Sequence, residues 1–232
     1  RLSSTGNARG RRQVNNAPSF QADPGLPHRS RLYSDLAGVY DHVFKGLFSR
    51  RIAEVIRQLA MPPGSRVLEV GVGTGLSLEA YPENCEITGI DLSAEMLEQA
   101  RRKLDPVRHS HIRLLQMDAL AMDLPTDHFD YVMAFHVVTV VPDPQRLIAA
   151  MANVSKNTGT IVMINHFASP KKVVRGVVNL VDPLTRKLGW STRLSLGEAI
   201  DGRLALERSY KTSPWSLFTV VEARKLGTPL AN

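Results

Sequence analysis

Apolar positions recur with two different periods along the chain. From Leu32 onward they return at helical spacing up to the break at Pro62, Pro63 and Gly64. Beyond that break, short apolar runs that suit buried strands alternate with segments of helical period. The pattern predicts strands over residues 66–70, 86–90, 112–116, 129–135, 160–165, 203–210 and 217–223, and helices over 75–80, 93–104, 144–154 and 170–187.

This alternation of strands and helices predicts the fold class. Apolar strands separated by helices form a mostly parallel sheet that is covered on both faces. Because such crossovers are right-handed, we expect a Rossmann-like, doubly wound α/β fold with seven strands. Residues 31–226 are predicted to form this domain, with an amphipathic helical segment over 31–60 at its start. Residues 1–30 hold five arginines against one aspartate and show no period, so we expect a disordered basic arm.

Composition narrows the class of partner and the compartment. The 232 residues carry 29 Lys and Arg against 22 Asp and Glu, a formal charge of +7 that favours anionic partners. Only 6% of residues are aromatic, which argues against a nucleic-acid partner. The one cysteine, Cys85, forms no internal disulfide, so a cytoplasmic protein is expected. No uncharged apolar run approaches the roughly 18–20 residues of a membrane span, which predicts a soluble or peripheral protein.

The segment RVLEVGVGTGLSL, residues 66–78, places a glycine-rich turn directly after the first strand, where such folds bind ligands. A P-loop is excluded because no Gly-Lys-Ser/Thr follows the glycines. Glu69 would repel a pyrophosphate, so a dinucleotide is disfavoured, and it would instead attract a cation. Asp91, at the end of the second strand, suits both hydroxyls of a ribose. A ribose beside a cationic amino-acid end describes S-adenosylmethionine.

Four motifs in chain order strengthen this interpretation: VLEVGVGTG, ITGIDLSAEMLEQA, QMDALAMDLPTDHFDYVMAFHVVTVVPDP and NTGTIVMINHF. Over residues 32–225 the chain resembles the class I S-adenosylmethionine-dependent methyltransferases. The resemblance implies that Asp91 holds the ribose and that Glu69 faces the methionine part of the cofactor. The other implied cofactor contacts are Tyr33, Tyr40, Gly71, Gly73, Thr74, Gly75, Leu92, Ser93, Met96, Met117, Asp118, Ala119, Phe135 and His136. Leu92 and Met96 also suit plain core positions, and the two tyrosines also suit simple packing.

The methyl acceptor calls for different residues. Methyl transfer is an in-line displacement, so the protein has to align a nucleophile that carries an unshared electron pair. An ammonium group loses its proton first, which a neutral imidazole assists. His136 and His166 follow the fourth and fifth predicted strands and are candidates for this role, with Thr139 and Asn165 as candidates to orient the acceptor. No pattern of metal ligands is evident, so no metal is expected.

Finer motifs narrow the acceptor. FHVVTVVPDP, NHF, RKLGW and SLFTVV are similar to segments of the soluble bacterial phosphatidylethanolamine N-methyltransferases. That resemblance implies a phospholipid substrate, methylated on its amine at a membrane surface. Basic residues surround an apolar stripe between residues 170 and 193, which is typical of a helix at an anionic lipid interface or of a stripe that packs on the sheet. The candidate lipid contacts are Lys171, Lys172, Arg175, Arg186 and Lys187. A monomer on the inner face of the membrane is expected.

Two other functions remain open at this point. One is a C- or O-methyltransferase for a quinone-like or other small apolar acceptor, since it would share all the cofactor motifs. The other is a non-enzymatic protein that keeps the fold and binds anionic membranes or, less readily, nucleic acid. Turnover without a phosphate-bearing headgroup would indicate the first, and membrane binding without cofactor binding would indicate the second.

Overall fold

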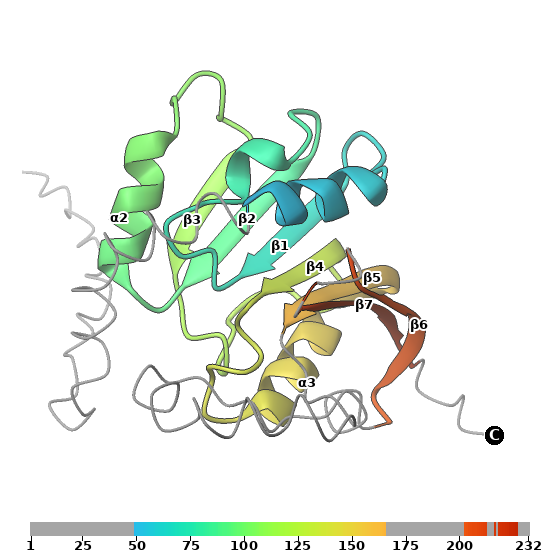
Figure 1. Cartoon of the computed structure of the whole chain (residues 1–232). Coiled ribbons are helices and arrows are strands. Elements are labelled where there is room, and N and C mark those ends of the chain that lie inside the picture. The colour runs from blue at the N-terminus through green and yellow to red at the C-terminus, as the bar shows by residue number, and fades with distance from the viewer. Residues whose placement is uncertain (1–48, 166–201, 213–215, 217, 227–232) are drawn as a thin grey trace, which may run out of the picture.

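The computed structural model describes residues 49–165, 202–212, 216 and 218–226, and the described part is built on one sheet of seven strands (Figure 1). A helix is described over residues 49–58. The elements that follow are β1 (Arg66–Val70), η1 (Leu78–Ala80), β2 (Glu86–Asp91), α2 (Ala94–Lys103), β3 (Ile112–Gln116), β4 (Phe129–Phe135), α3 (Pro144–Val154), β5 (Ser155–Asn165), β6 (Leu204–Tyr210) and β7 (Thr219–Lys225).

The strand order is β3-β2-β1-β4-β5-β7-β6. The first five strands in this order pair in parallel, whereas β7 runs antiparallel to both β5 and β6. The order reverses between β1 and β4, and ligands of doubly wound sheets bind at the carboxyl ends of the strands beside such a switch point. The fold predicted from the sequence is therefore confirmed.

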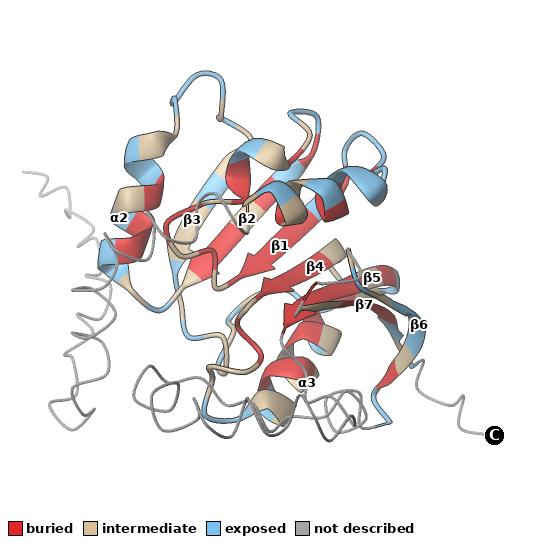
Figure 2. Cartoon of the chain, viewed as in Figure 1, coloured by how far each residue is buried: buried red, intermediate tan, exposed pale blue. Residues whose placement is uncertain are grey.

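Helices cover both faces of the sheet because the strand side chains alternate between them. In β4, Val132 and Ala134 join the apolar cluster that includes α3, whereas Met133 and Phe135 join the opposite cluster. That second cluster contains Ile52, Val55 and Ile56 of the first helix together with Leu97 and Ala100 of α2. Figure 2 shows the resulting buried band along the central strands. Burial on two faces explains why these strands are mostly apolar.

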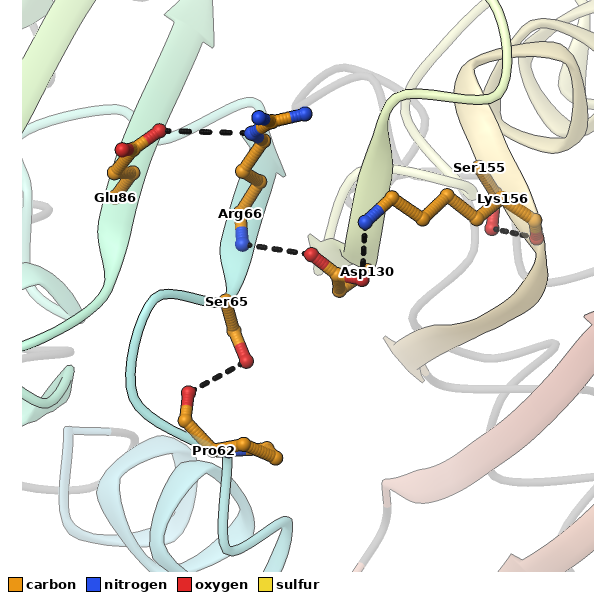
Figure 3. A network of polar contacts seen from close by, with 7 residues as sticks. All are labelled: Pro62, Ser65, Arg66, Glu86, Asp130, Ser155 and Lys156. Atoms are coloured by element: carbon orange, nitrogen blue, oxygen red, sulfur yellow. Dashed lines mark hydrogen bonds and ion pairs between the residues drawn. The ribbon is translucent and has the colours of Figure 1, made fainter.

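A polar network lies at the amino-terminal ends of the same strands (Figure 3). Asp130 accepts hydrogen bonds from the Arg66 backbone N–H at 3.0 Å and from the Lys156 ammonium at 2.6 Å. Arg66 also lies 3.7 Å from a carboxylate oxygen of Glu86. These contacts tie β1, β2, β4 and β5 together at their amino-terminal ends, and the glycine-rich turn lies at the opposite ends of the strands. Their role is structural, and ligands of such a sheet bind at the opposite, carboxyl ends of the strands.

Several predicted boundaries differ from the structure. The helix expected over 75–80 is wrong, because residues 73–77 form turns and only the 3-10 helix η1 follows. Gly75 has a φ of +76°, which a right-handed helix does not allow. β5 begins at Ser155 rather than at residue 160, and β7 lies two residues later than expected. The expected basic arm, the part of the expected helical segment before residue 49 and the expected basic helix over 170–193 lie outside the described residues.

Candidate active site

The glycine-rich turn after β1 presents backbone rather than side chains at the switch point. Gly71 and Gly73 have φ values of +70° and +54°, a region that side-chain-bearing residues rarely adopt. The N–H groups of Gly71 and Val72 both donate to the carbonyl of Ile90, at 2.8 and 3.0 Å, which fastens the turn to β2. A Cβ at Gly71 would lie 2.3 Å from Val137 Cγ2, whereas a Cβ at Gly73 would meet nothing within 4 Å. Gly73 therefore faces open space, where a ligand can approach the main chain.

Asp91 closes the turn from the end of β2. Its Oδ2 accepts a hydrogen bond from the Gly73 N–H at 2.8 Å, and its Oδ1 accepts one from the Ser93 N–H at 2.9 Å. Burial raises the pKa of this carboxyl, and the N–H donors of Ser93, Gly73 and Leu92 oppose the rise. Ser93 also caps α2, since its hydroxyl oxygen accepts from the Met96 N–H at 3.2 Å. Each carboxylate oxygen keeps acceptor capacity for a further donor such as a ribose hydroxyl.

Glu69 lies beneath the turn, near the end of β1, with 2% of its surface exposed. The Ser77 hydroxyl lies 2.6 and 2.7 Å from its two carboxylate oxygens, and the Tyr81 hydroxyl donates to one of them at 2.7 Å. Burial raises the pKa of Glu69 to about 7, against the lowering effect of the Ser77 and Tyr81 hydrogen bonds. This carboxyl thus changes its charge close to neutral pH and would be held ionised by a cationic ligand.

A pocket opens between the turn and β4. It is lined by Ile52, Glu69, Gly71, Val72, Gly73, Thr74, Leu76, Ser77, Phe135 and His136. His136 follows β4 with a φ of +62°, and its backbone N–H donates to the Ile164 carbonyl at 2.8 Å. Burial, helped by the charge of Arg51, lowers the pKa of its imidazole to about 4. The ring is therefore neutral at physiological pH.

A polar pair joins the loop after β4 to the last residue of β5. The Thr139 hydroxyl donates to Oδ1 of Asn165 at 3.2 Å. Asn165 is fully buried, and its Nδ2 has no hydrogen-bond partner among the described residues. A buried amide donor without a partner is costly, so this group calls for a partner such as a water, an ion or a ligand. The sequence named both residues, and the structure brings them together from positions 26 apart.

Comparison with known proteins identifies the family. Residues 68–163 match the model of a methyltransferase domain. Over 164 residues the chain is 40% identical to the phosphatidylethanolamine N-methyltransferase of Cereibacter sphaeroides. The aligned segment covers 70% of this chain and 81% of that protein. The chain belongs to the class I S-adenosylmethionine-dependent methyltransferases.

Two further matches define the breadth of the likeness. The methyltransferase is 32% identical to the demethylmenaquinone methyltransferase of Lysinibacillus sphaericus over 115 residues, which is 48% of each protein. The chain thus spans about half of that relative's length. The solved structure of YcgJ from Bacillus subtilis matches with a TM-score of 0.59 at 23% identity, over 68% of this chain and 70% of that one. This last likeness concerns the fold alone.

The residues of the turn fit the cofactor of the family. S-adenosylmethionine supplies a methyl group on a positively charged sulfonium, and its amino-acid end carries an ammonium group. Gly73 leaves room for close approach, Asp91 offers acceptors for ribose hydroxyls, and Glu69 becomes ionised near pH 7. The donor set therefore combines acceptors for the ribose with a buried carboxyl that favours positive charge.

Three of the other residues named for the cofactor lie in or beside the pocket, and the rest lie on the surface or in the interior. Thr74, Gly75 and Phe135 are fixed in or beside the pocket, with Thr74 and Phe135 in its lining. Leu92 is 65% exposed and so is not a core residue, whereas Met96 is 8% exposed and packs into the interior. Met117 and Ala119 pack on the apolar cluster beneath α3. Asp118 is exposed, and its Oδ1 accepts a hydrogen bond from the Leu120 N–H at 2.8 Å. Its second carboxylate oxygen takes no part in that bond.

Several named residues cannot be placed. Tyr33 and Tyr40, expected over the cofactor, lie outside the described residues, as do His166 and the candidate lipid contacts Lys171, Lys172, Arg175, Arg186 and Lys187. Their roles stay predictions.

The structure adds residues that the sequence did not single out. Ser77 and Tyr81 hold the Glu69 carboxyl, and Ile52 contributes to the pocket from a helix that precedes the sheet. A hydroxyl eight residues after Glu69, inside an otherwise apolar turn, was a usable signal for Ser77. Nothing in the local sequence indicates Tyr81 or Ile52, because the fold brings them to the site.

Two general properties of the described part bear on function. Within residues 49–165 and the later described segments, no cluster of three or more His, Cys, Asp or Glu side chains is placed to hold a metal. In the same residues, no helix has the length and apolarity that crossing a membrane requires.

Proposed function

We propose that this methyltransferase transfers methyl groups from S-adenosylmethionine to the amine of phosphatidylethanolamine, and to its mono- and dimethyl forms, at a membrane surface. The observation that carries the proposal is the 40% identity to a phosphatidylethanolamine N-methyltransferase over 81% of that protein's length. The likeness to the demethylmenaquinone enzyme is lower and spans only 48% of its length.

The pocket supports an amine as the acceptor. A neutral imidazole at His136 presents a nitrogen lone pair that can accept a hydrogen bond from an amine and orient it. A pKa of about 4 makes this ring too weak a base to take the ammonium proton, so we infer that the acceptor reacts as the neutral amine, its proton having passed to bulk buffer beforehand. The Nδ2 of Asn165 has no partner among the described residues, and Thr139 binds the Oδ1 of the same amide, so Nδ2 is a second orienting group for the acceptor. The protein thus acts by positioning, which accounts for much of the rate of a bimolecular displacement.

Membrane association is the part of the proposal that rests on sequence. The basic residues Lys171, Lys172, Arg175, Arg186 and Lys187 belong to a segment with a valine-rich stripe. Each such residue near anionic lipid adds on the order of 1 kcal/mol to binding. Reversing Lys171, Lys172 and Arg175 to Glu is expected to weaken cosedimentation with phosphatidylglycerol vesicles and to leave affinity for S-adenosylhomocysteine unchanged. Unchanged cosedimentation would remove the support for a docking segment.

A second candidate function is C- or O-methylation of a quinone-like acceptor. It is favoured by the 32% identity to a demethylmenaquinone methyltransferase. An uncharged ring would not need an ammonium to be deprotonated, and it would depend less on His136 and Asn165.

Acceptor competition separates the two candidates. The purified full chain is given labelled S-adenosylmethionine with vesicles of phosphatidylethanolamine and phosphatidylglycerol, with a demethylated quinol in detergent, or with both. We expect label in the lipid, and a smaller kcat/KM for the quinol. An Asp91→Ala variant, which lacks the ribose acceptor, is the inactive control, and Asp123→Ala, an exposed carboxylate in a loop, is the matched active control. Label in the quinol alone would reverse the assignment.

A further inference from the structure

Arg51 is a partly buried cation on the helix that contributes to the pocket. It belongs to the helix over residues 49–58 and directly precedes Ile52, which lines the pocket. Its guanidinium donates from Nη1 to the hydroxyl oxygen of Ser216 at 3.3 Å. Among the described residues no carboxylate pairs with it. A half-buried guanidinium held by a neutral hydroxyl keeps most of its donors for another group.

A second cation, Lys211, binds the same serine. The Lys211 ammonium donates to the backbone carbonyl of Ser216 at 3.0 Å. Ser216 is 2% exposed, and its hydroxyl donates to the Phe218 carbonyl at 3.0 Å while accepting from the Phe218 N–H at 3.2 Å. Ser216 is therefore a fixed point that joins two positive side chains from distant parts of the chain, 160 residues apart in sequence (211 less 51).

Arg51 is in electrostatic range of the pocket. The ring of Phe218 packs edge-on against His136 with their centroids 4.7 Å apart. Arg51 contributes to the lowered pKa of His136, second to burial, so its charge acts on the pocket wall. A cation that acts on the neutral imidazole, with a second cation bound to the same serine, creates a local positive potential that an anion would relieve.

Solvation alone is a weaker explanation, as a neighbour on the same helix shows. Arg57 is exposed, and its Nε donates to the Ala53 carbonyl at 3.2 Å within its own helix. Arg51 instead reaches across to Ser216 and stays partly buried. Guanidinium groups bind phosphate oxygens with paired donors, and lysine adds a point charge to such sites.

We propose that Arg51 and Lys211, joined through Ser216, form a subsite that binds the phosphate of an acceptor that carries both a phosphate and an amine. The subsite rests on the proposed function for its choice of acceptor. It adds the group that would distinguish a phosphorylated amine from a quinone-like ring. The phosphate can belong to a lipid headgroup or to free phosphoethanolamine, and the experiment below separates these sources.

Binding tests the subsite without turnover. Glycerophosphoethanolamine, the soluble headgroup, is titrated calorimetrically into the full chain loaded with S-adenosylhomocysteine, with ethanolamine as the phosphate-free comparison. We expect Arg51→Gln to weaken glycerophosphoethanolamine by roughly 10–100-fold, as the loss of charged hydrogen bonds predicts, and to leave ethanolamine unchanged. Arg57→Gln should behave as the unmodified protein. Equal affinities for Arg51→Gln and Arg57→Gln would overturn the subsite.

A second variant guards against a folding defect. If Arg51→Gln also loses affinity for S-adenosylhomocysteine, Lys211→Gln replaces it, because Lys211 is exposed and outside the pocket lining. Weaker glycerophosphoethanolamine binding with normal S-adenosylhomocysteine binding supports the subsite. Binding unchanged from the unmodified protein overturns it.

Turnover then separates the subsite from the proposed function. Unmodified protein and Arg51→Gln are compared with phosphatidylethanolamine vesicles and with phosphoethanolamine. If the KM of the variant rises only for the vesicles, the lipid is the source of the phosphate. If the KM rises only for phosphoethanolamine, the soluble compound is the source. Headgroup binding that depends on Arg51 without any lipid methylation keeps the subsite and rejects the lipid as substrate. Lipid methylation that does not depend on Arg51 keeps the lipid as substrate and rejects the subsite.

Discussion

Ser77 lies 2.6 and 2.7 Å, through its hydroxyl oxygen, from both carboxylate oxygens of Glu69. This arrangement gives a fully buried carboxyl two neutral donors, since Tyr81 binds the same group. Neutral donors compensate burial only in part, so the pKa of Glu69 stays near 7. A group of this kind in the lining of a cofactor pocket couples cofactor binding to pH.

Affinity for S-adenosylmethionine should therefore fall as the pH drops from 8 to 6. The positive charges of the cofactor favour ionised Glu69, whereas the ligand-free protein binds a proton there below a pH of about 7. Below that pH, binding has to release the proton, which weakens affinity by up to about tenfold per pH unit. Isothermal titration in buffers of different ionisation enthalpy measures both the affinity and the proton released.

Glu69→Gln is the control for this coupling. The amide preserves the shape of the side chain and removes the titration, so the variant should bind more weakly and lose this pH dependence. An unmodified protein whose affinity is constant from pH 6 to 8 would contradict the coupling.

Gly71 and Gly73 should respond differently to alanine. At Gly71 the added Cβ would lie 2.3 Å from Val137 Cγ2, and the φ angle is also unfavourable for alanine. We therefore expect a loss of about 2–5 kcal/mol in the free energy of unfolding. At Gly73 only φ is unfavourable, so the loss should be about 1–2 kcal/mol, with a marked loss of S-adenosylhomocysteine affinity. Urea unfolding and titration measure the two effects. Equal stability of the variants would contradict the packing assigned to Gly71.

The sequence was sufficient to find the seven strands, though not every strand boundary, and insufficient for the glycine turn. β1 and β4 are mostly apolar because both faces are covered, and that pattern is visible in the chain. The segment after Gly71 has apolar residues at helical spacing, yet the structure has turns there. Positive φ angles at Gly73 and Gly75 and the hydrogen bonds from Ser77 to Glu69 oppose a helix. Tertiary contacts overrode a local pattern.

The candidate site divides along the same line. Glu69 and Asp91 lie at the carboxyl ends of strands, at fixed spacing from the glycines, so motif and fold place them from the sequence. Arg51 and Ser216 are 165 residues apart and meet only because the first helix packs near β7. Contacts of this kind leave no local pattern. The protonation of Glu69 likewise depends on burial, which the residue type alone does not reveal.

His136 should remain neutral throughout the range in which the enzyme works. Burial and the charge of Arg51 lower the pKa of its imidazole to about 4, so its ring signals in an NMR titration should not move between pH 5.5 and 8. Arg51→Gln should raise this pKa, and Arg57→Gln should leave it unchanged. Titration of His136 near 6.5 in the unmodified protein would show that the ring is open to water and would contradict its assigned role.

Thr139 should matter through Asn165. Thr139→Val keeps the shape of the side chain and removes the donor, which leaves the buried Oδ1 of Asn165 without this bond. We expect a loss of about 1–3 kcal/mol in the free energy of unfolding and a lower kcat, with affinity for S-adenosylhomocysteine retained. Thr139→Ser restores the hydroxyl and should recover both. Identical kcat values for the Val and Ser variants would remove the pair from the acceptor site.

The identity of the methylated atom tests the central proposal most directly. Purified full chain is incubated with S-adenosylmethionine carrying a ¹³C methyl group and with vesicles of phosphatidylethanolamine and phosphatidylglycerol, and the extracted lipid is examined by NMR. The account predicts ¹³C on the headgroup nitrogen, absent from the Asp91→Ala variant. Active protein that labels a quinol on carbon or oxygen and leaves the phosphatidylethanolamine nitrogen unlabelled would contradict it.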